Sequence, residues 1–405
     1  MLFYVEGVHE RGERGGHGAD VGWTDRLPKD PTAAARVLLR RAPVIDGHID
    51  LPWLVRALYK NNVSAVDLHA PVPGHVDIPR LRTGGVGAFF WSVYVPCAAD
   101  LGVSDGADFT NATWRVRDTL EQIDIAHLLM DKFSDTFAPA RTAAEITTAI
   151  QAGKIAGIIG LEGGHHLGNS LQALRTYYAL GARYMTLTHT CDNAFATSSG
   201  TIGGTPRPPP AKGLSTLGRA LIREMNRLGM LIDLSHVSDP TALDALSVTR
   251  APIILSHSSA RTLRDIPRNV PDAVLARIGE GEGKVDGVVM VNFAPGFIAE
   301  DPKHANLTRV ADHVEHMAGI MGRRHVGIGS DFDGIGSTPI GLEDVSKYPD
   351  LIAELFSRGW SARELAGLTG GNLLRVMAGA ERVAEQMRAE GVPPAAEVWE
   401  KRTDL

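Results

Sequence analysis

Short apolar runs alternate with longer amphipathic stretches along most of this chain. Eight of the apolar runs are rich in valine and isoleucine, and they lie at residues 43–49, 86–95, 155–161, 184–188, 230–235, 252–256, 286–292 and 325–330. Near-continuous apolar character is typical of strands that are buried on both faces of a parallel sheet. The pattern therefore predicts eight buried, parallel strands.

Helical periodicity fills the intervals between these strands. The predicted helices lie at Pro31–Arg41, Thr113–Phe133, Ala143–Ala152, Ser170–Leu180, Ser215–Leu228, Asp239–Ser247, Pro271–Ile278, Leu307–Met321, Leu342–Arg358 and Ser361–Leu368. Eight strands that alternate with helices predict an α/β fold, and specifically a (β/α)8 TIM-like barrel. A doubly wound open sheet is the alternative, but no G-x-G-x-x-G motif follows the first strand.

The barrel is expected to form a single domain over residues 31–385. Residues 1–30 are polar and Gly-rich and are interpreted as an extension, and residues 386–405 as a tail packed on or near the barrel. The chain has 405 residues, of which 44% are hydrophobic, so it can bury a large core. α/β barrels often reach this size as one unit. A loop rich in Gly, Ser and Pro at residues 197–213 is expected to border the active site.

The composition limits which binding partners and which cellular location are expected for this protein. The formal net charge is −6 and no long run of Lys and Arg occurs, so nucleic acid is not an expected partner. We find no apolar run of about 18 residues, no signal peptide and no apolar anchor tail. The expected location is therefore cytoplasmic. Two cysteines, Cys97 and Cys191, are too few for a disulfide framework.

Groups that bind metals or move protons follow six of the eight predicted strands. The first strand ends in His48 and Asp50, which point to the same face because side chains alternate along a strand. The other five strand ends carry Glu162, His189, His236, His257 and Asp331. Any one of these residues alone is more often structural than functional. Active sites of this fold lie at the carboxyl ends of the strands, so their joint placement predicts one shared site.

The donor types favour two metal ions over one. Three histidines, one aspartate and one glutamate exceed the four ligands of a tetrahedral zinc site. Two metals that share one carboxylate fit this set better, with zinc as the expected ion and manganese, cobalt or iron as substitutes. Such a pair, about 3.5 Å apart, can hold a hydroxide and polarise a carbonyl oxygen. The predicted chemistry is hydrolysis.

Long segments of the chain resemble the membrane (renal) dipeptidase family of amidohydrolase-like metallopeptidases. By this resemblance the chain is identified as a bacterial member. The matching segments include VIDGHIDLPW, GLEGGHHLGNSLQALRTYYALGARYMTLTHTCDN, GLSTLGRALIREMNRLGMLIDLSHVS, PIILSHSSAR, PRNVPD and GIGSDFDG, in the family's order over roughly residues 43–377. The resemblance implies hydrolysis of dipeptides that have a free C-terminal carboxylate and an L or D residue at that end. It also favours a homodimer.

The resemblance implies a ligand set for two zinc ions per subunit. His48, Asp50 and Glu162 match the ligands of the first zinc. Glu162, His236 and His257 match those of the second, so Glu162 and a hydroxide or water would bridge the two ions.

Three further residues match groups that act on the substrate. His189 matches the residue that contacts the scissile carbonyl oxygen, and Arg268 the one that pairs with the substrate carboxylate. Asp331 matches the acid/base that carries a proton from the hydroxide to the leaving amine. By sequence alone Asp333 is an equal candidate for this last role, and only the resemblance favours Asp331.

Other residues near the strand ends have simpler interpretations. His165 and His166 are expected to be structural neighbours of the site. Trp53 and Trp91 either line the pocket or, as is commoner for tryptophan, belong to the core.

Two departures from the family affect these expectations. Phe297 stands where animal members often have a tyrosine near the substrate carboxylate, so one carboxylate contact is in doubt. Cys97 and Cys191 match a pair that is disulfide-bonded in the secreted, lipid-anchored animal members. In a reducing cytosol they are expected to remain thiols that lie close together.

Two rival functions stand beside the dipeptidase. One is another amidohydrolase-type reaction, on N-acyl amino acids or lactams. The other is a non-catalytic binding protein on a degraded barrel, which the complete set of five ligands and Asp331 disfavours.

Overall fold

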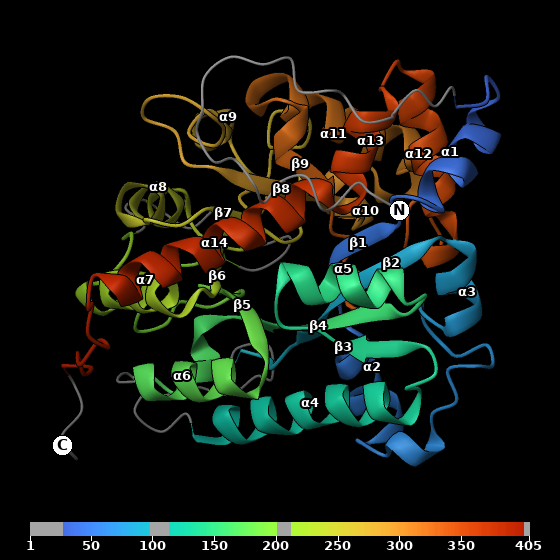
Figure 1. Ribbon diagram of the computed structural model, residues 1–405. Helices are drawn as coiled ribbons and strands as arrows, with labels where there is room; N and C mark the ends of the chain where they lie inside the picture. The colour runs from blue at the N-terminus through green and yellow to red at the C-terminus, as the bar shows by residue number, and fades with distance from the viewer. Residues whose placement is uncertain (1–26, 98–112, 201–211, 401–405) are drawn as a thin grey trace.

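The computed structural model describes residues 27–97, 113–200 and 212–400. Eight strands follow one another around a parallel sheet in the order β1-β2-β4-β5-β6-β7-β8-β9 (Figure 1). Their bounds are β1 Val44–Ile49, β2 Val86–Val93, β4 Ile155–Glu162, β5 Ala182–Thr186, β6 Leu231–Asp233, β7 Ile253–Leu255, β8 Gly287–Val291 and β9 Val326–Ile328. All eight predicted strands are confirmed. The short strand β3, Phe137–Pro139, was not predicted, and it pairs in parallel with β4.

The sheet closes on itself between its first and last strands. Ile49 forms a parallel bridge to Phe332, just beyond β9. The N–H of Asp331 donates to the carbonyl of His48 at 3.0 Å, and the N–H of Asp50 donates to Phe332 at 2.9 Å. These bonds join the two ends at the same edge of the sheet that carries His48 and Asp50. The (β/α)8 barrel predicted from the sequence is therefore confirmed.

Helices surround the barrel on its outer side. Their bounds are α1 Pro31–Leu39, α2 Leu51–Tyr59, α3 Ile78–Thr83, α4 Thr113–Lys132, α5 Ala143–Gln151, α6 Leu171–Leu180, α7 Thr216–Leu228, α8 Asp239–Val248, α9 Asp272–Leu275, α10 Pro295–Ile298, α11 Leu307–Met321, α12 Tyr348–Ser357, α13 Ala362–Ala366 and α14 Asn372–Ala389. Each predicted helix has a counterpart, although α9 is shorter than expected and α12 begins only at Tyr348. α2, α3, α10 and α14 were not predicted.

Local capping explains where a typical helix of this barrel starts and stops. The side chain of Ser215 accepts a hydrogen bond from the N–H of Gly218, which satisfies a free donor at the start of α7. Gly229 then ends α7 with φ of 81°, a left-handed conformation that glycine adopts without steric cost. The next strand begins two residues later, so the chain reverses tightly from helix to strand.

Helix α14 covers the amino-terminal end of the barrel. The Asn372 amide donates to the carbonyl of Val326 at the start of β9. Arg375 pairs with Asp286, which directly precedes β8. Gly379 lies so close to Pro252, before β7, that an added Cβ would stand 2.7 Å from the proline ring. This end of the barrel is therefore closed, and the open end is the one where the strands finish.

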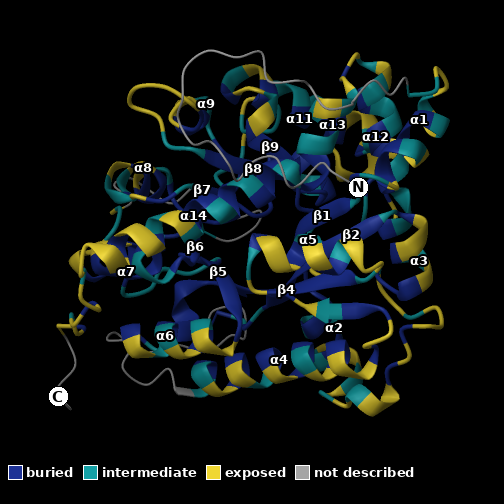
Figure 2. Cartoon of the chain, in the orientation of Figure 1, coloured by how far each residue is buried: buried dark blue, intermediate teal, exposed yellow. Residues whose placement is uncertain are grey.

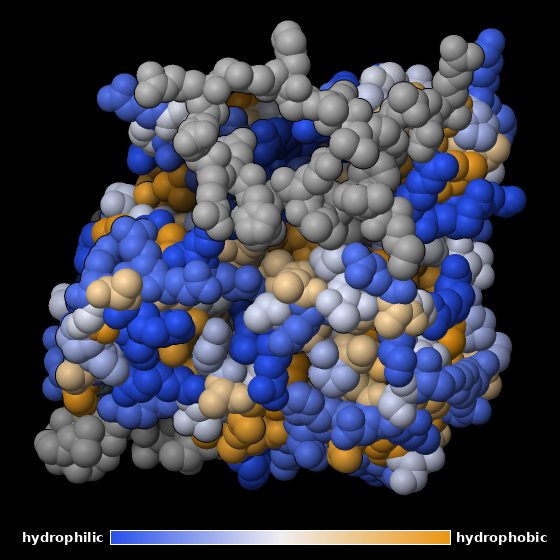
Figure 3. Space-filling view, viewed as in Figure 1, coloured by the Kyte–Doolittle hydropathy of each residue, from blue (hydrophilic) through white to orange (hydrophobic). Residues whose placement is uncertain are grey.

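The buried residues follow the strands, and the exposed residues lie on the outer faces of the helices (Figure 2). Every residue of the eight barrel strands is buried. The face shown in Figure 3 mixes hydrophilic and hydrophobic residues. In the part of the chain that the structure describes, no helix has the length and apolar character needed to cross a bilayer.

The predicted division of the chain stays a prediction. Residues 1–26 of the expected N-terminal extension and residues 401–405 of the expected tail lie outside the described residues. Helix α14 continues to Ala389 and so passes residue 385, where the barrel domain was expected to end.

Candidate metal centre

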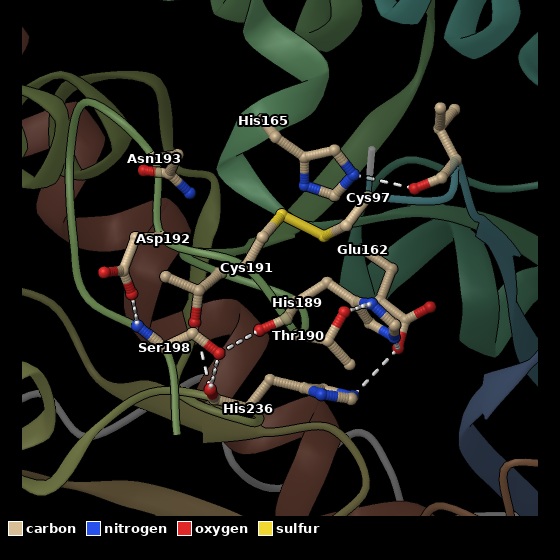
Figure 4. The surroundings of a disulfide bond; sticks show 12 residues. Cys97, Glu162, His165, His189, Thr190, Cys191, Asp192, Asn193, Ser198 and His236 are labelled. Carbon is tan, nitrogen blue, oxygen red and sulfur yellow. Dashed lines mark hydrogen bonds and ion pairs between the residues drawn. A yellow bond between two sulfur atoms is a disulfide. The ribbon is translucent and has the colours of Figure 1, made fainter. Parts of the chain in front are cut away.

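The carboxyl ends of five strands bring imidazole groups and carboxylates into contact. Glu162 is the last residue of β4, and its Oε1 atom is the centre of the cluster. This oxygen lies near the Nε2 atoms of four histidines: His236 at 3.1 Å, His257 at 3.2 Å, His48 at 3.6 Å and His189 at 3.7 Å. Figure 4 shows His189 and His236 pointing toward Glu162. One carboxylate therefore joins ligands from both predicted metal positions.

A second group of acids meets the cluster at His48. The Nε2 atom of His48 is 3.2 Å from Asp50 Oδ2 and 4.0 Å from Asp331 Oδ1. Three overlapping sets of donor atoms result, each within 4.8 Å: His48, Asp50 and Asp331; His48, Glu162 and His257; Glu162, His189 and His236. All five predicted ligands are thus in one place.

The charges in this cluster suit cations. His48 Nε2 and Asp50 Oδ1 are buried and have no hydrogen-bond partner among the described residues. Burial lowers the pKa of His48, but Asp50, Glu162 and Asp331 outweigh it and raise that pKa to about 10. Burial, reinforced by Asp50 and Asp331, raises the pKa of Glu162 well above its usual range. Both pKa shifts show that a positive charge between His48 and Glu162 would be stabilised.

The other two histidines predicted as ligands, His236 and His257, have the opposite tendency. Burial lowers the pKa of His236 and of His257 well below the usual value for imidazole. Both rings are therefore neutral near pH 7, and only a neutral imidazole nitrogen can bind a metal. The donor set fits two divalent cations that share Glu162.

The backbone adopts uncommon conformations at two of these positions. His236 has φ of 64° and Asp331 has φ of 66°, in the left-handed region that non-glycine residues seldom occupy. Such conformations cost on the order of 1–3 kcal/mol and persist where the surrounding structure imposes them, often at functional sites.

Two buried aspartates that the sequence analysis did not single out shape the strand ends. In β1 the Oδ1 atom of Asp46 accepts the N–H of His48 at 2.8 Å and that of Ser330 at 3.1 Å. In β6 the Oδ1 atom of Asp233 accepts the N–H groups of Ser235 and Ser256. In both places the carboxylate ties two neighbouring strand ends together. A lone acid inside an apolar strand, as in VIDGHI and LIDLSH, is the signal that could have found them.

The structure separates the two aspartates that sequence left as alternatives. Asp331 joins the cluster, and its Oδ2 atom accepts a 2.9 Å hydrogen bond from the amide of Asn292. Burial and the nearby Asp50 raise the pKa of Asp331 to about 7, although His48 and Asn292 oppose the shift. Asp333 bonds to His75 instead, through the N–H of His75 at 2.6 Å.

His189 is held near the cluster by a disulfide (Figure 4) and by an aromatic neighbour. Cys191, two residues beyond His189, is disulfide-bonded to Cys97, just beyond β2. The ring of Tyr94 lies 4.9 Å from that of His189. The expectation that both cysteines stay thiols is therefore wrong for this structure, because the ends of β2 and β5 place the two sulfur atoms within bonding distance.

Arg268, which is expected to bind the substrate carboxylate, lies beside the cluster, with only 6% of its surface exposed. Its Nη2 donates to the carbonyl of His257 at 2.7 Å, and its Nη1 donates to Ser258 Oγ at 3.1 Å. Its guanidinium carbon lies 5.5 Å from the centre of the Phe297 ring. A small pocket is lined by apolar residues and by Arg268, His236, Asp239, Ser258 and Asn269. Phe297 therefore contacts Arg268 through its ring face, without a hydroxyl to offer a substrate.

The other residues considered near the strand ends lie either in the core or beside the cluster. Trp91 is fully buried and stacks on Phe89, so it belongs to the core. Trp53 packs on the edge of Tyr94, which puts it close to His189. His165 Nε2 lies 2.7 Å from the carbonyl of Val95, and His166 is buried behind it.

The loop expected to border the site does so at its described flank. The Ser198 hydroxyl donates to the carbonyl of His189, and the Ser199 N–H donates to that of His236 at 2.8 Å. Residues 201–211 of this loop lie outside the described part of the chain.

Comparisons with known proteins agree with this geometry. A family model described as membrane dipeptidase, peptidase family M19, matches residues 32–391. The dipeptidase aclJ of Aspergillus oryzae is 44% identical over 355 residues, which cover 86% of this chain and 81% of that relative.

Solved structures share the fold. A metallopeptidase from Rhodobacter sphaeroides, bound to a phosphinate mimic of the dipeptide L-Ala-D-Ala, superposes with a TM-score of 0.73 at 28% identity, covering 83% of this chain and 99% of its own. The probable dipeptidase PvdM from Pseudomonas aeruginosa, at 22% identity and a TM-score of 0.76, covers 88% of this chain and 100% of its own and is alike in fold. The chain therefore belongs to the membrane dipeptidase family and is a peptide-bond hydrolase of the metallopeptidase type.

Proposed function

We propose that the protein is a binuclear zinc dipeptidase that cleaves dipeptides with a free C-terminal carboxylate. The observation that carries this proposal is the position of Glu162 Oε1, within 3.7 Å of the Nε2 atoms of four histidines at one end of the barrel. His48, Asp50 and Glu162 would hold one zinc, and Glu162, His236 and His257 the other. When bound, such a pair supplies a hydroxide at neutral pH and polarises the substrate carbonyl.

The chain's own residues would then position the dipeptide. The Arg268 guanidinium, with its Nε atom buried and without a hydrogen-bond partner among the described residues, would pair with the substrate carboxylate. Burial and nearby positive groups lower the pKa of His189 well below its usual value, so its ring is neutral. A neutral His189 with a protonated Nε2 would donate to the scissile carbonyl oxygen as negative charge develops there.

Asp331 would move the proton. Its raised pKa, about 7, lets the carboxylate accept a proton from the attacking water and return it to the leaving amine near neutral pH. Asn292 bonds to the Oδ2 atom, which leaves Oδ1 directed at the cluster.

Arg268 and His189 would hold the substrate's carboxylate and scissile carbonyl, and not the side chain of its C-terminal residue. This supports the acceptance of either an L or a D residue at the C-terminal position. The Rhodobacter sphaeroides relative was solved with a mimic of a D-terminal dipeptide, which supports the same proposal. Hydrolysis of N-acyl amino acids or lactams remains the alternative reaction.

Two measurements test the proposal. Metal analysis of the active protein should find about two zinc ions per chain, and removal by a chelator should abolish activity that zinc restores. A substrate screen should favour dipeptides over N-acyl amino acids and lactams, including L- and D-terminal pairs. Less than about one zinc per active chain, or faster cleavage of acylated amino acids, would contradict it.

Zinc as the native metal, a homodimer and a cytoplasmic location stay predictions. The Cys97–Cys191 disulfide weighs against the last of these, because reducing compartments seldom keep such bonds.

A further inference from the structure

A continuous chain of hydrogen bonds lies beneath the cluster, on the side away from its open end. The Asp233 Oδ2 atom accepts from Ser256 Oγ at 2.6 Å, and Ser256 Oγ is 2.8 Å from His257 Nδ1. The Tyr184 hydroxyl is 2.8 Å from His48 Nδ1. One serine thus connects a buried carboxylate with the outer nitrogen of His257, and one tyrosine contacts that of His48.

The Asp233 carboxylate sets the direction of the first bond. Its Oδ1 accepts two backbone N–H groups, from Ser235 at 3.0 Å and from Ser256 at 2.8 Å. Its Oδ2 accepts from the hydroxyls of Thr186 and Ser256, each at 2.6 Å. These four bonds fill the acceptor positions of an ionised carboxylate, which has no proton to give. The Ser256 hydroxyl must therefore donate to Asp233.

The other bonds of Ser256 follow from this. Its single proton is used, so its oxygen can only accept from His257. His257 must carry its proton on Nδ1, which leaves the lone pair of Nε2 facing Glu162 Oε1 at 3.2 Å and His236 Nε2 at 2.9 Å.

Tyr184 is the partner of the outer nitrogen of His48, with its hydroxyl 2.8 Å from Nδ1. The tyrosine ring fits only because residue 160 is a glycine, where an added Cβ would stand 2.2 Å from that ring. Tyr184 is fully buried, so this position does not depend on solvent.

We propose that Asp233, acting through Ser256, fixes His257 with the proton on Nδ1 and the lone pair of Nε2 toward the metal position. Asp233 is thus a positioning residue for the metal position that contains His257. This inference rests on the proposed function for its use, but the position of the proton on His257 can be measured without any metal.

The decisive variant is Asp233→Asn, which keeps the shape but turns one acceptor into a donor. Its oxygen can still accept the two backbone N–H groups, so its amide nitrogen faces Ser256 and donates to it. Ser256 must then donate to His257 Nδ1, which moves the ring proton to Nε2. Nitrogen-15 NMR of histidine-labelled, metal-free protein should show His257 protonated on Nδ1 in the wild type and on Nε2 in D233N. The same ring proton in both proteins would overturn the proposal.

Zinc affinity, measured by competition with a chromophoric chelator, gives the second readout. We expect Asp233→Asn and Ser256→Ala to weaken the zinc site that contains His257 about 10-fold or more, and Tyr184→Phe to weaken chiefly the site that contains His48. Tyr177→Phe is the matched control, because it removes another buried tyrosine hydroxyl, one that donates to the carbonyl of His166. It should bind zinc within about twofold of the wild type.

The two proposals can fail separately. If the wild type binds no zinc and cleaves no dipeptide, the proposed function fails, while the ring-proton measurement still decides the role of Asp233. If D233N moves the proton but zinc affinity is unchanged, the positioning role is wrong. Should D233N not fold, Ser256→Ala decides: loss of a fixed His257 tautomer supports the proposal, and an unchanged one contradicts it.

Discussion

At the scale of single residues, environment separates groups of the same chemical type. Asp331 and Asp333 are two residues apart in GIGSDFDG and share the same left-handed φ of 66°. Asp331 faces the histidine cluster, whereas Asp333 accepts from the backbone of His75. His48 and His257 are both buried, yet the pKa of one is raised by acids and that of the other is lowered by burial.

The two aspartates make a matched pair for mutagenesis. We expect Asp331→Asn to lower kcat about 100-fold or more, because the amide cannot carry the proton to the leaving amine. Asp333→Asn should keep most of the activity, since its oxygen can still accept from His75. Steady-state kinetics on one dipeptide, with circular dichroism to verify folding, measure both. Full activity in Asp331→Asn would remove it from the mechanism.

At the scale of elements, the loops after the strands are held by bonds between residues that are close in space but far apart in the sequence. Cys97 and Cys191 are 94 residues apart, and their bond joins the end of β2 to the loop that carries His189. Asp46 and Asp233 do the same for the strand pairs β1 and β9, and β6 and β7. The catalytic end of the barrel therefore depends on cross-links as well as on strand pairing.

Removal of the disulfide should lower stability and activity together. A cross-link over a loop of this length restricts the unfolded chain, and its loss typically costs roughly 2–4 kcal/mol of the free energy of unfolding. We expect the double variant Cys97→Ser, Cys191→Ser to unfold at lower urea concentration and to show a lower kcat, because the His189 loop loses its tether. Reductant should weaken the wild type in the same way and leave the double variant unchanged. A wild type insensitive to reductant would argue against this role.

At the scale of the whole molecule, the barrel encloses polar groups whose protonation opposes folding. His313 of α11 is buried, and its Nδ1 accepts the N–H of Ala260 at 3.0 Å, while its Nε2 lies 3.1 Å from the carbonyl of Ile298. Burial lowers the pKa of His313 from 6.5 to about 4. The ring thus joins the loop after β7 to α10 only in its neutral form.

The shift predicts a loss of stability in mild acid. The unfolded chain takes up a proton near pH 6.5, whereas the folded chain resists it until about pH 4. The free energy of unfolding should therefore fall as the pH drops through this range, by roughly 3 kcal/mol, and be unaffected by this group above it. Urea unfolding at pH 7, 6, 5 and 4 measures the slope. His313→Gln should flatten it and the exposed His304→Gln should not; equal slopes in all three proteins would contradict the assignment.

By itself the sequence determined the eight strands, the barrel and the meeting of the five predicted ligands at one edge of the sheet. The reason is physical: strands buried on both faces are continuous apolar runs, and parallel strands end at one edge, so His48, Glu162, His236 and His257 had to meet. Tertiary structure alone decided what depends on pairs far apart in sequence. The bond between Cys97 and Cys191, the position of Asp331 rather than Asp333 at the cluster, and the chain from Asp233 to His257 each require contacts between separate strands. A pattern of apolar and polar positions records which residues are buried. It carries no information on which buried groups form hydrogen bonds with one another, or on which of them donates.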